Sequence, residues 1–416
     1  MRWTDTVVVG AGHAGLAVSA LLTEAGRDHV VIERGRVAQS WRTQRWDSLR
    51  LLTPAWLSRL PGYSYDGADQ DTFLPAGEVA AYLTRYAAWT AAPVAENLTV
   101  LSVRRHGDGW LVGCDGGAWY ARHVVIASGH ATRPALPAFA WRLPRRVQAL
   151  SPLGYRRPED VAPGRVLVVG ASASGVQIAD ELAAAGREVT LAAGRHTRLP
   201  RHYRGQDITW WLDRAGQFDR RIDQVRDRDA YRREPSVQLS GHGRSVDLAA
   251  LAARGVRLTG RVLDIDGDGV RLADDLPGTV ADADRRMHQL LDRLDSRLWP
   301  PEPGPRPEPV PVPAVRPDRL DLRGERYGAV IWATGFRGDY SYLHVPGVEQ
   351  HGWLPQYRGA TAVPGLYVIG QPFGNRRRSG LIDGARLDAA DIVDAITARS
   401  PSPAPGVRTG RYATVP

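Results

Sequence analysis

Two short glycine-rich segments contain the residues whose types and spacing are best suited to bind a ligand. The first has the pattern G-x-G-x-x-G, and its residues are Gly10, Gly12, His13, Ala14 and Gly15. Glycines at this spacing let the backbone approach a pyrophosphate, which binds at a helix N-terminus where free N–H groups point outward. Glu33 follows about twenty residues later, with Arg34 beside it, and its carboxylate can accept hydrogen bonds from ribose hydroxyls. This segment predicts a dinucleotide site.

The second segment is an altered copy of the first, formed by Gly170, Ser172, Ser174 and Gly175. Ser172 replaces the middle glycine, and its small side chain still allows close approach to a phosphate. The next strand is followed by no acidic residue but by Arg195 and Arg198. A carboxylate would repel a ribose 2′-phosphate, whereas an arginine can pair with it through two hydrogen bonds. The segment predicts NADPH as the preferred ligand over NADH; the alternative is that both arginines are merely solvated.

Each glycine segment needs a strand before it and a helix after it, and the surrounding sequence supplies both. Residues 6–9 form a β-branched run, residues 16–25 an apolar helix ended by Gly26, and residues 30–33 a second strand. The same order recurs as a strand at 165–169, a helix at 176–185 and a strand at 188–191. Two βαβ units at this separation predict an α/β protein with two Rossmann-like dinucleotide-binding domains.

Three more apolar strands end in turns of small residues. They cover residues 124–129, 330–335 and 365–370, and their terminal residues are Ser128, Gly129, Thr334, Gly335 and Gly370. A helix is expected at residues 384–398. The Pro-rich stretch 300–317 reads as an extended surface loop, and residues 400–416 as a loose, flexible tail.

Composition narrows the class of protein further. The chain has 416 residues, enough for two or three domains at about 100–200 residues each. Its net charge of +9 comes from arginine alone. These arginines could form a surface for nucleic acid or acidic lipid, but they are scattered among acids, which favours arginine-rich coding in a GC-rich genome and no nucleic-acid partner.

Other features of the sequence argue against a membrane span, a secreted protein, a reactive cysteine pair and a metal site. We expect no membrane span and, with no signal peptide at the N-terminus, a cytoplasmic enzyme. Cys114 is the single cysteine, so chemistry that needs a cysteine pair within one subunit is excluded. The histidines are not spaced as zinc ligands, so no metal site is expected.

With both glycine segments in view, the chain resembles the class B flavin-dependent monooxygenase superfamily, and within it the CzcO-like and YUCCA-like bacterial flavoproteins. The resemblance covers nearly the whole chain. It is carried by residues 10–15 with Glu33, by 40–42 and 45–51, by 170–175 and 200–205, and by the motif at 332–336.

The resemblance implies a split FAD domain, formed by residues 1–150 and 320–399, with an NADPH domain inserted at 151–319. It also implies that Trp41, Arg42 and Asp47 lie along the FAD and that Gly370 lies near its ribityl chain or pyrophosphate. Asp383 belongs to a segment that the family keeps near the flavin. The implied reaction is hydride transfer from NADPH to FAD, followed by O2 activation as a flavin C4a-(hydro)peroxide that oxygenates a small organic substrate. The oligomeric state is open, with a dimer as one option.

The chain departs from the family at two positions. Ser151 stands where the family fingerprint before the second glycine turn has a histidine. A family asparagine falls near Leu52 and Thr53, where Thr53 can donate one hydrogen bond. We therefore take Thr53 and Trp46 as the candidate catalytic residues. Trp46 could line an apolar substrate pocket, and the alternative is that it is simply a core residue. An NADPH oxidase and a non-oxygenating redox sensor stay open as alternatives.

The run 376–378 contains three consecutive arginines close in sequence to the expected flavin contacts. It is a candidate for an anionic substrate or a cofactor phosphate, and the alternative is a solvated loop.

Overall fold

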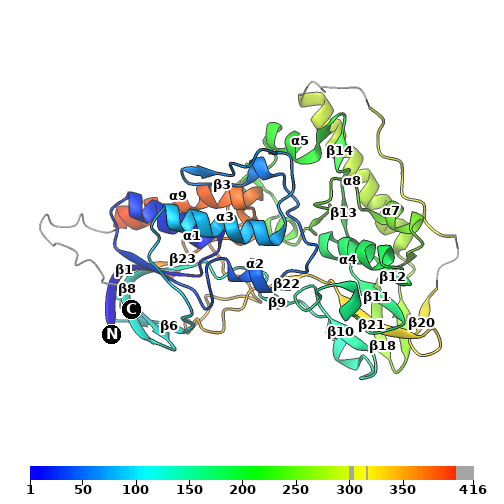
Figure 1. Cartoon of the computed structure of the whole chain (residues 1–416), viewed down its shortest axis with the longest axis horizontal. Coiled ribbons are helices and arrows are strands. Elements are labelled where there is room, and N and C mark those ends of the chain that lie inside the picture. Colours follow the sequence, from blue (N-terminus) through cyan, green and yellow to red (C-terminus); the bar gives the residue numbers. More distant parts are fainter. Residues whose placement is uncertain (299–303, 315–316, 400–416) are drawn as a thin grey trace, which may run out of the picture.

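The protein consists of two α/β units placed side by side along its long axis, as the computed structural model in Figure 1 shows. The structure describes residues 1–298, 304–314 and 317–399. The expected tail at 400–416 lies outside the described residues. The described part of the Pro-rich stretch, 304–314, contains no helix or strand.

The first unit is built on a seven-stranded sheet whose centre is parallel. Its strand order is β5-β2-β1-β8-β7-β6, with β23 also paired to β8. The last six residues of β1 (Arg2–Val9) are buried because helices or loops cover both faces of the sheet. The other strands are β2 (His29–Ile32), β5 (Val94–Ala95), β6 (Val100–His106), β7 (Gly109–Cys114), β8 (Gly117–Ile126) and β23 (Leu366–Val368).

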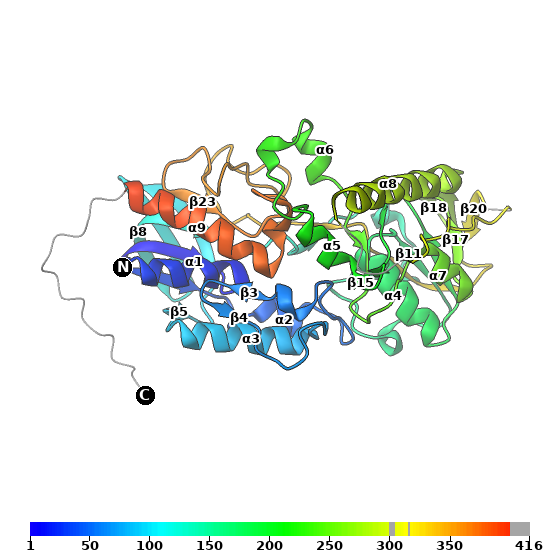
Figure 2. The same cartoon turned by 90° about the horizontal axis from the view of Figure 1, so that it is seen from above.

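Three helices cover one face of this sheet, although they come from opposite ends of the chain. They are α1 (His13–Glu24), α3 (Ala76–Trp89) and α9 (Ile382–Arg399), and their apolar side chains share one core with Val8 and Val31. Figure 2 shows α9 and α1 side by side. The C-terminal segment therefore completes the first unit, and both β23 and α9 confirm the expected strand and helix.

The second unit is built on a fully parallel five-stranded sheet of order β10-β21-β11-β12-β17. Its strands are β10 (Gln148–Leu150), β11 (Arg165–Val169), β12 (Val189–Ala192), β17 (Arg257–Thr259) and β21 (Tyr327–Trp332). One face packs against α4 (Ala173–Ala184) and α7 (Leu248–Ala253). The other face packs against an antiparallel sheet of β18 (Val262–Asp266), β19 (Gly269–Leu272) and β20 (Arg319–Asp321).

The membership of β21 corrects the expected domain boundaries. Residues 320–399 were assigned to the first unit, but β21 lies between β10 and β11 at the centre of the second sheet. The second sheet also starts at Gln148, before the expected boundary at 150. The second unit therefore runs from about β10 to the end of β21, because strand pairing, not position in the chain, defines the sheet.

The chain crosses between the units along two neighbouring segments. Strand β9 (Arg133–Pro134) pairs with β22 (Phe336–Arg337) in an antiparallel ladder, and each follows the turn that ends β8 or β21. Two further helices, α5 (Ile208–Arg214) and α8 (Leu276–Arg297), pack together at one end of the second unit. No helix in the described part of the chain is long and apolar enough to cross a membrane.

Candidate functional site

The first glycine turn connects β1 to α1, and its first and last glycines have no room for a side chain. Gly10 has φ +108°, and a Cβ there would lie 2.6 Å from the Ala127 carbonyl oxygen. A Cβ on Gly15 would lie 1.9 Å from the Gly10 carbonyl oxygen. At Gly12, by contrast, a Cβ would meet nothing within 4 Å, so the middle glycine faces open space. The turn thus leaves room for a ligand at the one position where the backbone must be approached closely.

The N-terminus of α1 is free to bind an anion. Gly12 is its N-cap residue, and no side chain caps the helix. Glu33, at the end of β2, accepts hydrogen bonds from the backbone N–H of Ala11 at 2.8 Å and of Gly35 at 3.1 Å. Its carboxylate therefore holds the glycine turn in place at the carboxyl edge of the sheet. Arg34 is exposed beside it.

The ends of β8 and β23 meet the first glycine turn at this edge. A Cβ on Gly370 would lie 3.2 Å from Ala14 Cβ, so β23 ends against the start of α1. The Ser128 hydroxyl lies 2.8 Å from the Tyr342 hydroxyl. Gly129 has φ +86°, a conformation that favours glycine. The structure thus brings the expected residues of the first site together at one edge of one sheet.

Two histidines lie at the same edge, and one of them was not expected there. Nδ1 of His130 is 3.1 Å from the Gly370 carbonyl oxygen, and because a carbonyl only accepts, Nδ1 carries the hydrogen and Nε2 is left as an acceptor. Burial and the nearby His130 and Arg45 lower the pKa of His13 to about 4. Burial also lowers the pKa of His130 to about 4, against the hydrogen bond to Gly370. Both rings are therefore neutral, and His13 Nε2 has no hydrogen-bond partner among the described residues.

The second glycine turn repeats the geometry of the first. Gly170 has φ +109°, and a Cβ there would lie 2.4 Å from the Ala333 carbonyl oxygen. A Cβ on Gly175 would lie 1.9 Å from the Gly170 carbonyl oxygen. Ser172, the N-cap of α4, has φ −85° and ψ −176°, close to the −82° and −178° of Gly12. Its side chain does not cap the helix, so the α4 N-terminus is also free, with Ser174 in its first turn.

The two arginines after β12 have opposite environments. Arg195 is exposed and forms no ion pair within the described residues. Arg198 is 5% exposed, and its guanidinium pairs with Asp247 at 2.8 Å and with Asp284 at 2.5 Å. It also donates to the Glu308 carbonyl oxygen at 2.9 Å. The expectation that Arg198 binds a phosphate is therefore wrong, because two internal carboxylates already occupy its guanidinium.

The motif at 332–336 lies at the second glycine turn. Ala333, at the end of β21, closes this turn as Ala127 closes the first. Thr334 donates from Oγ1 to the Ala135 carbonyl oxygen at 2.7 Å, and Gly335 has φ +98°. Thr334 and Gly335 thus begin the segment that leads to β22, at the carboxyl edge of the second sheet. Ser128 and Gly129 have the equivalent position at the first glycine turn, where they begin the segment that leads to β9.

Helix α2 (Gln39–Thr43) carries Trp41 and Arg42, and Asp47 follows it. The Arg42 guanidinium binds the Val37 carbonyl at 3.1 Å and Thr84 Oγ1 at 2.9 Å. Trp41 stacks under the Arg45 guanidinium, 5.0 Å from its ring centroid. Asp47 is exposed. The described contacts hold Trp41 and Arg42 against the first unit.

The two candidate catalytic residues lie in different surroundings. Trp46 is 6% exposed and belongs to the core of the second unit. It lines a pocket of about 260 Å³ with Ser48, α4 and the loop around His242. It is therefore a contact between the units in this structure. Thr53 is half-buried in the bend before 3₁₀ helix η1 (Ala55–Leu57).

Asp383 and the three arginines of 376–378 are all held in ion pairs. Asp383 is fully buried and accepts from Arg59 at 2.6 Å, from Arg386 at 3.0 Å and from Arg378. Arg378 also binds Asp213 at 2.7 Å, on the α5 segment of the second unit. The interpretation of this run as a solvated loop is wrong, and none of these guanidinium groups is available to a ligand, because each has carboxylate partners.

The sequence did not indicate the roles of two residues that the structure shows, Arg201 and His130. Arg201 is fully buried, pairs with Asp207 at 2.5 Å and donates to the Leu52 carbonyl at 2.8 Å, joining the two units. Nothing local in the sequence marks this role. His130 had a signal, since it directly follows Ser128 and Gly129 at the end of a strand. Within the described residues, no group of three His, Cys, Asp or Glu side chains could hold a metal ion.

Comparisons with known proteins agree with this architecture. The family model described as pyridine nucleotide-disulphide oxidoreductase matches residues 7–225. An uncharacterized oxidoreductase, CzcO-like, from Geobacillus kaustophilus is 30% identical over 396 residues, which cover 94% of this chain and 98% of that protein. A flavin-containing monooxygenase from Stenotrophomonas maltophilia superposes with a TM-score of 0.69 at 22% identity, covering 96% of this chain and 99% of that chain.

A further solved structure, OTEMO in complex with FAD and NADP, superposes with a TM-score of 0.55 at 18% identity and covers 95% of this chain and 85% of that chain. At these identities the two structural likenesses establish the fold. The expected fold of two dinucleotide-binding domains is confirmed.

The chain belongs to the pyridine nucleotide-disulphide oxidoreductase family. It is an NAD(P)H-dependent flavin oxidoreductase whose fold is that of the flavin monooxygenases, as the resemblance of its sequence indicated. With Cys114 as its single cysteine, it does not carry the cysteine pair of a dithiol mechanism within one subunit. Burial and the nearby Asp115 also raise the pKa of this thiol to about 11.

Proposed function

We propose that this protein is an NADPH-dependent FAD monooxygenase that oxygenates a small organic substrate with O2. The observation that carries the proposal is the contrast between the two nucleotide edges. One has the buried carboxylate of Glu33 beside its glycine turn, and the other has the exposed Arg195. A carboxylate suits the free ribose hydroxyls of FAD, whereas an unpaired guanidinium suits the 2′-phosphate of NADPH.

The residues at the first edge fit FAD. The uncapped N-terminus of α1 and the open space at Gly12 suit its pyrophosphate. Gly370 and the neutral His130 lie where β23 ends against Ala14. There, Nε2 of His130 can accept a hydrogen bond from a hydroxyl, such as those of a ribityl chain.

The residues at the second edge fit NADPH. The uncapped N-terminus of α4 suits its pyrophosphate, since Ser172 keeps the backbone conformation of Gly12. The bound cofactors supply the hydride transfer and the oxygen chemistry. The protein's own part is to hold the two cofactors at the carboxyl edges of its two sheets and to exclude water from the reacting rings.

Oxygen transfer is tested with isotopically labelled O2 and a panel of small amines, sulfides and ketones. A monooxygenase transfers one labelled oxygen atom to the product and consumes one NADPH for each product formed. Labelled product from any panel member supports the proposal. NADPH consumption that yields only hydrogen peroxide with every member contradicts it.

An NADPH oxidase is the second candidate, and the region of Thr53 favours it. The family asparagine is replaced near Leu52 and Thr53, and the Leu52 carbonyl is already bound by Arg201 at 2.8 Å. The same experiment separates the two candidates, since an oxidase releases one peroxide for each NADPH. A redox sensor that oxygenates nothing would consume NADPH only until its flavin is reduced. The cytoplasmic location and the dimer remain predictions.

A further inference from the structure

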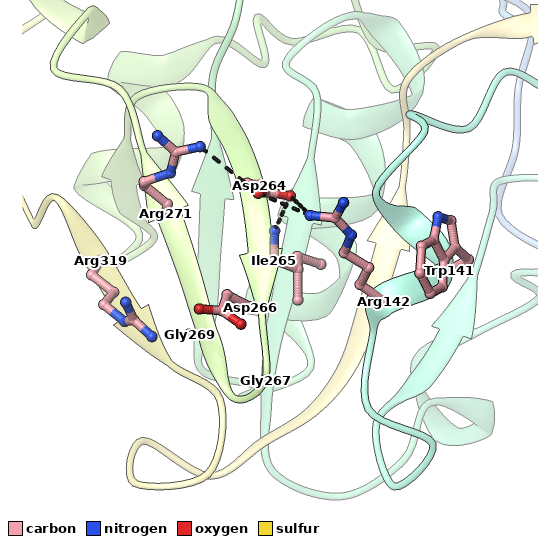
Figure 3. Close-up of a pocket in the computed structure, with 9 residues that line it drawn as sticks. All are labelled: Trp141, Arg142, Asp264, Ile265, Asp266, Gly267, Gly269, Arg271 and Arg319. Atoms are coloured by element: carbon pink, nitrogen blue, oxygen red, sulfur yellow. Dashed lines mark hydrogen bonds and ion pairs between the residues drawn. The ribbon is translucent and has the colours of Figure 1, made fainter.

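Two arginines at the junction of the two units have no carboxylate partner. Elsewhere in the chain arginines are commonly paired: in the pocket of about 560 Å³ beside β18, for example, Asp264 binds both Arg142 and Arg271 (Figure 3). Arg45 and Arg156 are half-buried and form no ion pair within the described residues. Withdrawing a charge from water without a counter-charge is unfavourable, so this junction lacks a negative charge.

Arg156 belongs to the second unit and holds the chain segment of Arg45 in place. Its guanidinium donates to the carbonyl oxygen of Arg45 at 2.5 Å and to that of Thr43. Its own carbonyl accepts a hydrogen bond from the N–H of Asp47 at 3.0 Å. Burial and the nearby Arg156 lower the pKa of Arg45, although a guanidinium keeps its proton in proteins. Arg156 therefore brings a second positive charge to the junction and fixes the position of the first.

The Arg45 guanidinium lies at the edge of the first sheet that carries the first glycine turn. It stacks on the ring of Trp41, 5.0 Å from the centroid, and donates to the Gln44 carbonyl oxygen at 3.0 Å. Burial lowers the pKa of His13 and of His130 to about 4, and the charge of Arg45 contributes in both cases. The guanidinium is therefore close to both neutral rings, beside the start of α1. Its hydrogen bond to Gln44 leaves most of its donors free for a ligand.

Under the proposed function, the two cofactors do not supply the missing negative charge. The FAD pyrophosphate has the N-terminus of α1, and the NADPH phosphates have the N-terminus of α4 and Arg195. The reacting rings meet where the two units adjoin, because the hydride passes directly from one ring to the other. Neither the oxidised flavin ring nor the reduced nicotinamide ring carries a negative charge. The remaining reactant that can supply one is the organic substrate.

We propose that the substrate carries a carboxylate and that Arg45 binds this carboxylate beside the flavin. The inference rests on the proposed function and names the substrate class of that site. A guanidinium can bind both oxygens of a carboxylate, which fixes the orientation of the substrate as well as its position. Arg156 is a positioning residue, since it binds the backbone that carries Arg45. The uncharged remainder of the substrate presents the atom that is oxygenated.

Binding is measured on the FAD-loaded protein without NADPH, so that the result does not depend on oxygenation. Benzoate and hexanoate are titrated while the absorbance spectrum of the oxidised flavin is recorded, and benzamide and hexanamide are the matched neutral probes. We expect at least one carboxylate to perturb the spectrum and to bind at least about tenfold more tightly than its amide. Carboxylates that bind no more tightly than their amides would overturn the proposal.

Variants then connect this binding to Arg45. Arg45→Gln should weaken the carboxylate at least about tenfold and leave the amide unchanged, whereas Arg45→Lys, which keeps the charge, should lose less. Arg157→Gln is the matched control, since Arg157 is exposed and pairs with Asp160 at 3.3 Å. FAD affinity, measured by fluorescence titration, should be the same in all three variants. Unchanged carboxylate affinity in Arg45→Gln contradicts the proposal, and so does a parallel loss of FAD affinity, because Arg45 would then bind a cofactor phosphate.

A pair of oxidisable probes separates the substrate class from the proposed function. With labelled O2, kcat/KM for para-methylthiobenzoate should exceed that for para-methylthiobenzamide at least about tenfold, and Arg45→Gln should remove most of this difference. Equal oxygenation of both sulfides would contradict the substrate class and leave the monooxygenase intact. Carboxylate binding without any labelled product would contradict the proposed function instead.

Discussion

At the scale of single residues, burial decides which charged groups of this protein are free to bind a ligand. Arg195 and Arg198 are three positions apart, yet one is exposed and the other pairs with two carboxylates. Asp383, like Arg198, is not free to bind a ligand, because three arginines bind its carboxylate. Burial alone would raise the pKa of Asp383, but the hydrogen bonds from Arg59 and Arg386 lower it below its ordinary value.

The two arginines give a paired prediction. Arg195→Ala should raise KM for NADPH far more than for NADH, by the equivalent of about 1–3 kcal/mol, because it removes a charge-assisted hydrogen bond to the 2′-phosphate. Arg198→Ala should instead lower the free energy of unfolding by about 3–5 kcal/mol, because it leaves two carboxylates unpaired in the interior. Steady-state kinetics with both nucleotides and denaturant unfolding check the pair. An equal effect of Arg195→Ala on both nucleotides would contradict its assignment.

The neutral histidines give a pH dependence. The pKa of His13 and of His130 is about 4 in the folded protein, below the ordinary value of about 6.5. Between these values the unfolded chain binds protons that the folded chain does not. The free energy of unfolding should therefore fall as the pH is lowered from about 6.5 to 4, by up to about 1.4 kcal/mol per pH unit for each histidine.

Urea unfolding of the cofactor-free protein at several pH values measures this slope. In the double variant His13→Gln, His130→Asn the slope should be smaller, because neither replacement titrates in this range. The buried His29 and His196, whose pKa values are also lowered by burial, contribute to the slope that remains. Identical slopes in the variant and the parent would show that the two rings are not kept neutral by the fold.

At the scale of elements, the binding edges result from two equivalent strand-turn-helix units. In each, the outer glycines are fixed by contacts with the neighbouring strand end, while the middle position faces open space or carries a small serine. These units were predictable from the sequence because strand, turn and helix are all encoded within about 30 contiguous residues. The place of β21 was not predictable in this way, because its partners β10 and β11 lie more than a hundred residues earlier in the chain.

Two glycines of the first turn should differ in their effects, one on stability and the other on FAD binding. Gly10→Ala should destabilise the protein, because a Cβ there meets the Ala127 carbonyl at 2.6 Å and the φ of +108° is strained for alanine. Gly12→Ala should leave thermal stability of the cofactor-free protein nearly unchanged, because its Cβ has free space, yet weaken FAD binding strongly. Thermal unfolding and fluorescence titration with FAD test both. Normal FAD affinity in Gly12→Ala would contradict the placement of the pyrophosphate.

At the scale of the whole molecule, two buried arginines join the two units. Arg201 connects Asp207 to the Leu52 carbonyl, and Arg378 connects Asp383 of the first unit to Asp213 of the second. The sequence shows these arginines but not their contacts across the units, since only the complete fold brings the Leu52 carbonyl to Arg201 and Asp213 to Arg378. For Trp46 the sequence left a substrate pocket and a core position open, and the structure places it in the core of the second unit.

The contacts of Arg378 between the two units predict an effect on the stability of the fold. Arg378→Ala should lower the free energy of unfolding by about 1.5–3 kcal/mol, because it removes a buried guanidinium that binds both Asp383 and Asp213, while Asp383 keeps Arg59 and Arg386. Arg85→Ala is the matched control: it breaks an exposed pair with Glu78 and should cost less than about 1 kcal/mol. Denaturant unfolding of both variants checks this. Equal losses would mean that the cluster between the units does not contribute to stability.

The central claim is that the two edges bind FAD and NADPH and pass a hydride between them. The most direct test is to mix the FAD-loaded protein with NADPH or with NADH in the absence of oxygen and to follow the absorbance of the oxidised flavin. The account predicts complete bleaching by one equivalent of NADPH, at concentrations well below those needed for NADH. A flavin that NADPH leaves oxidised would contradict it.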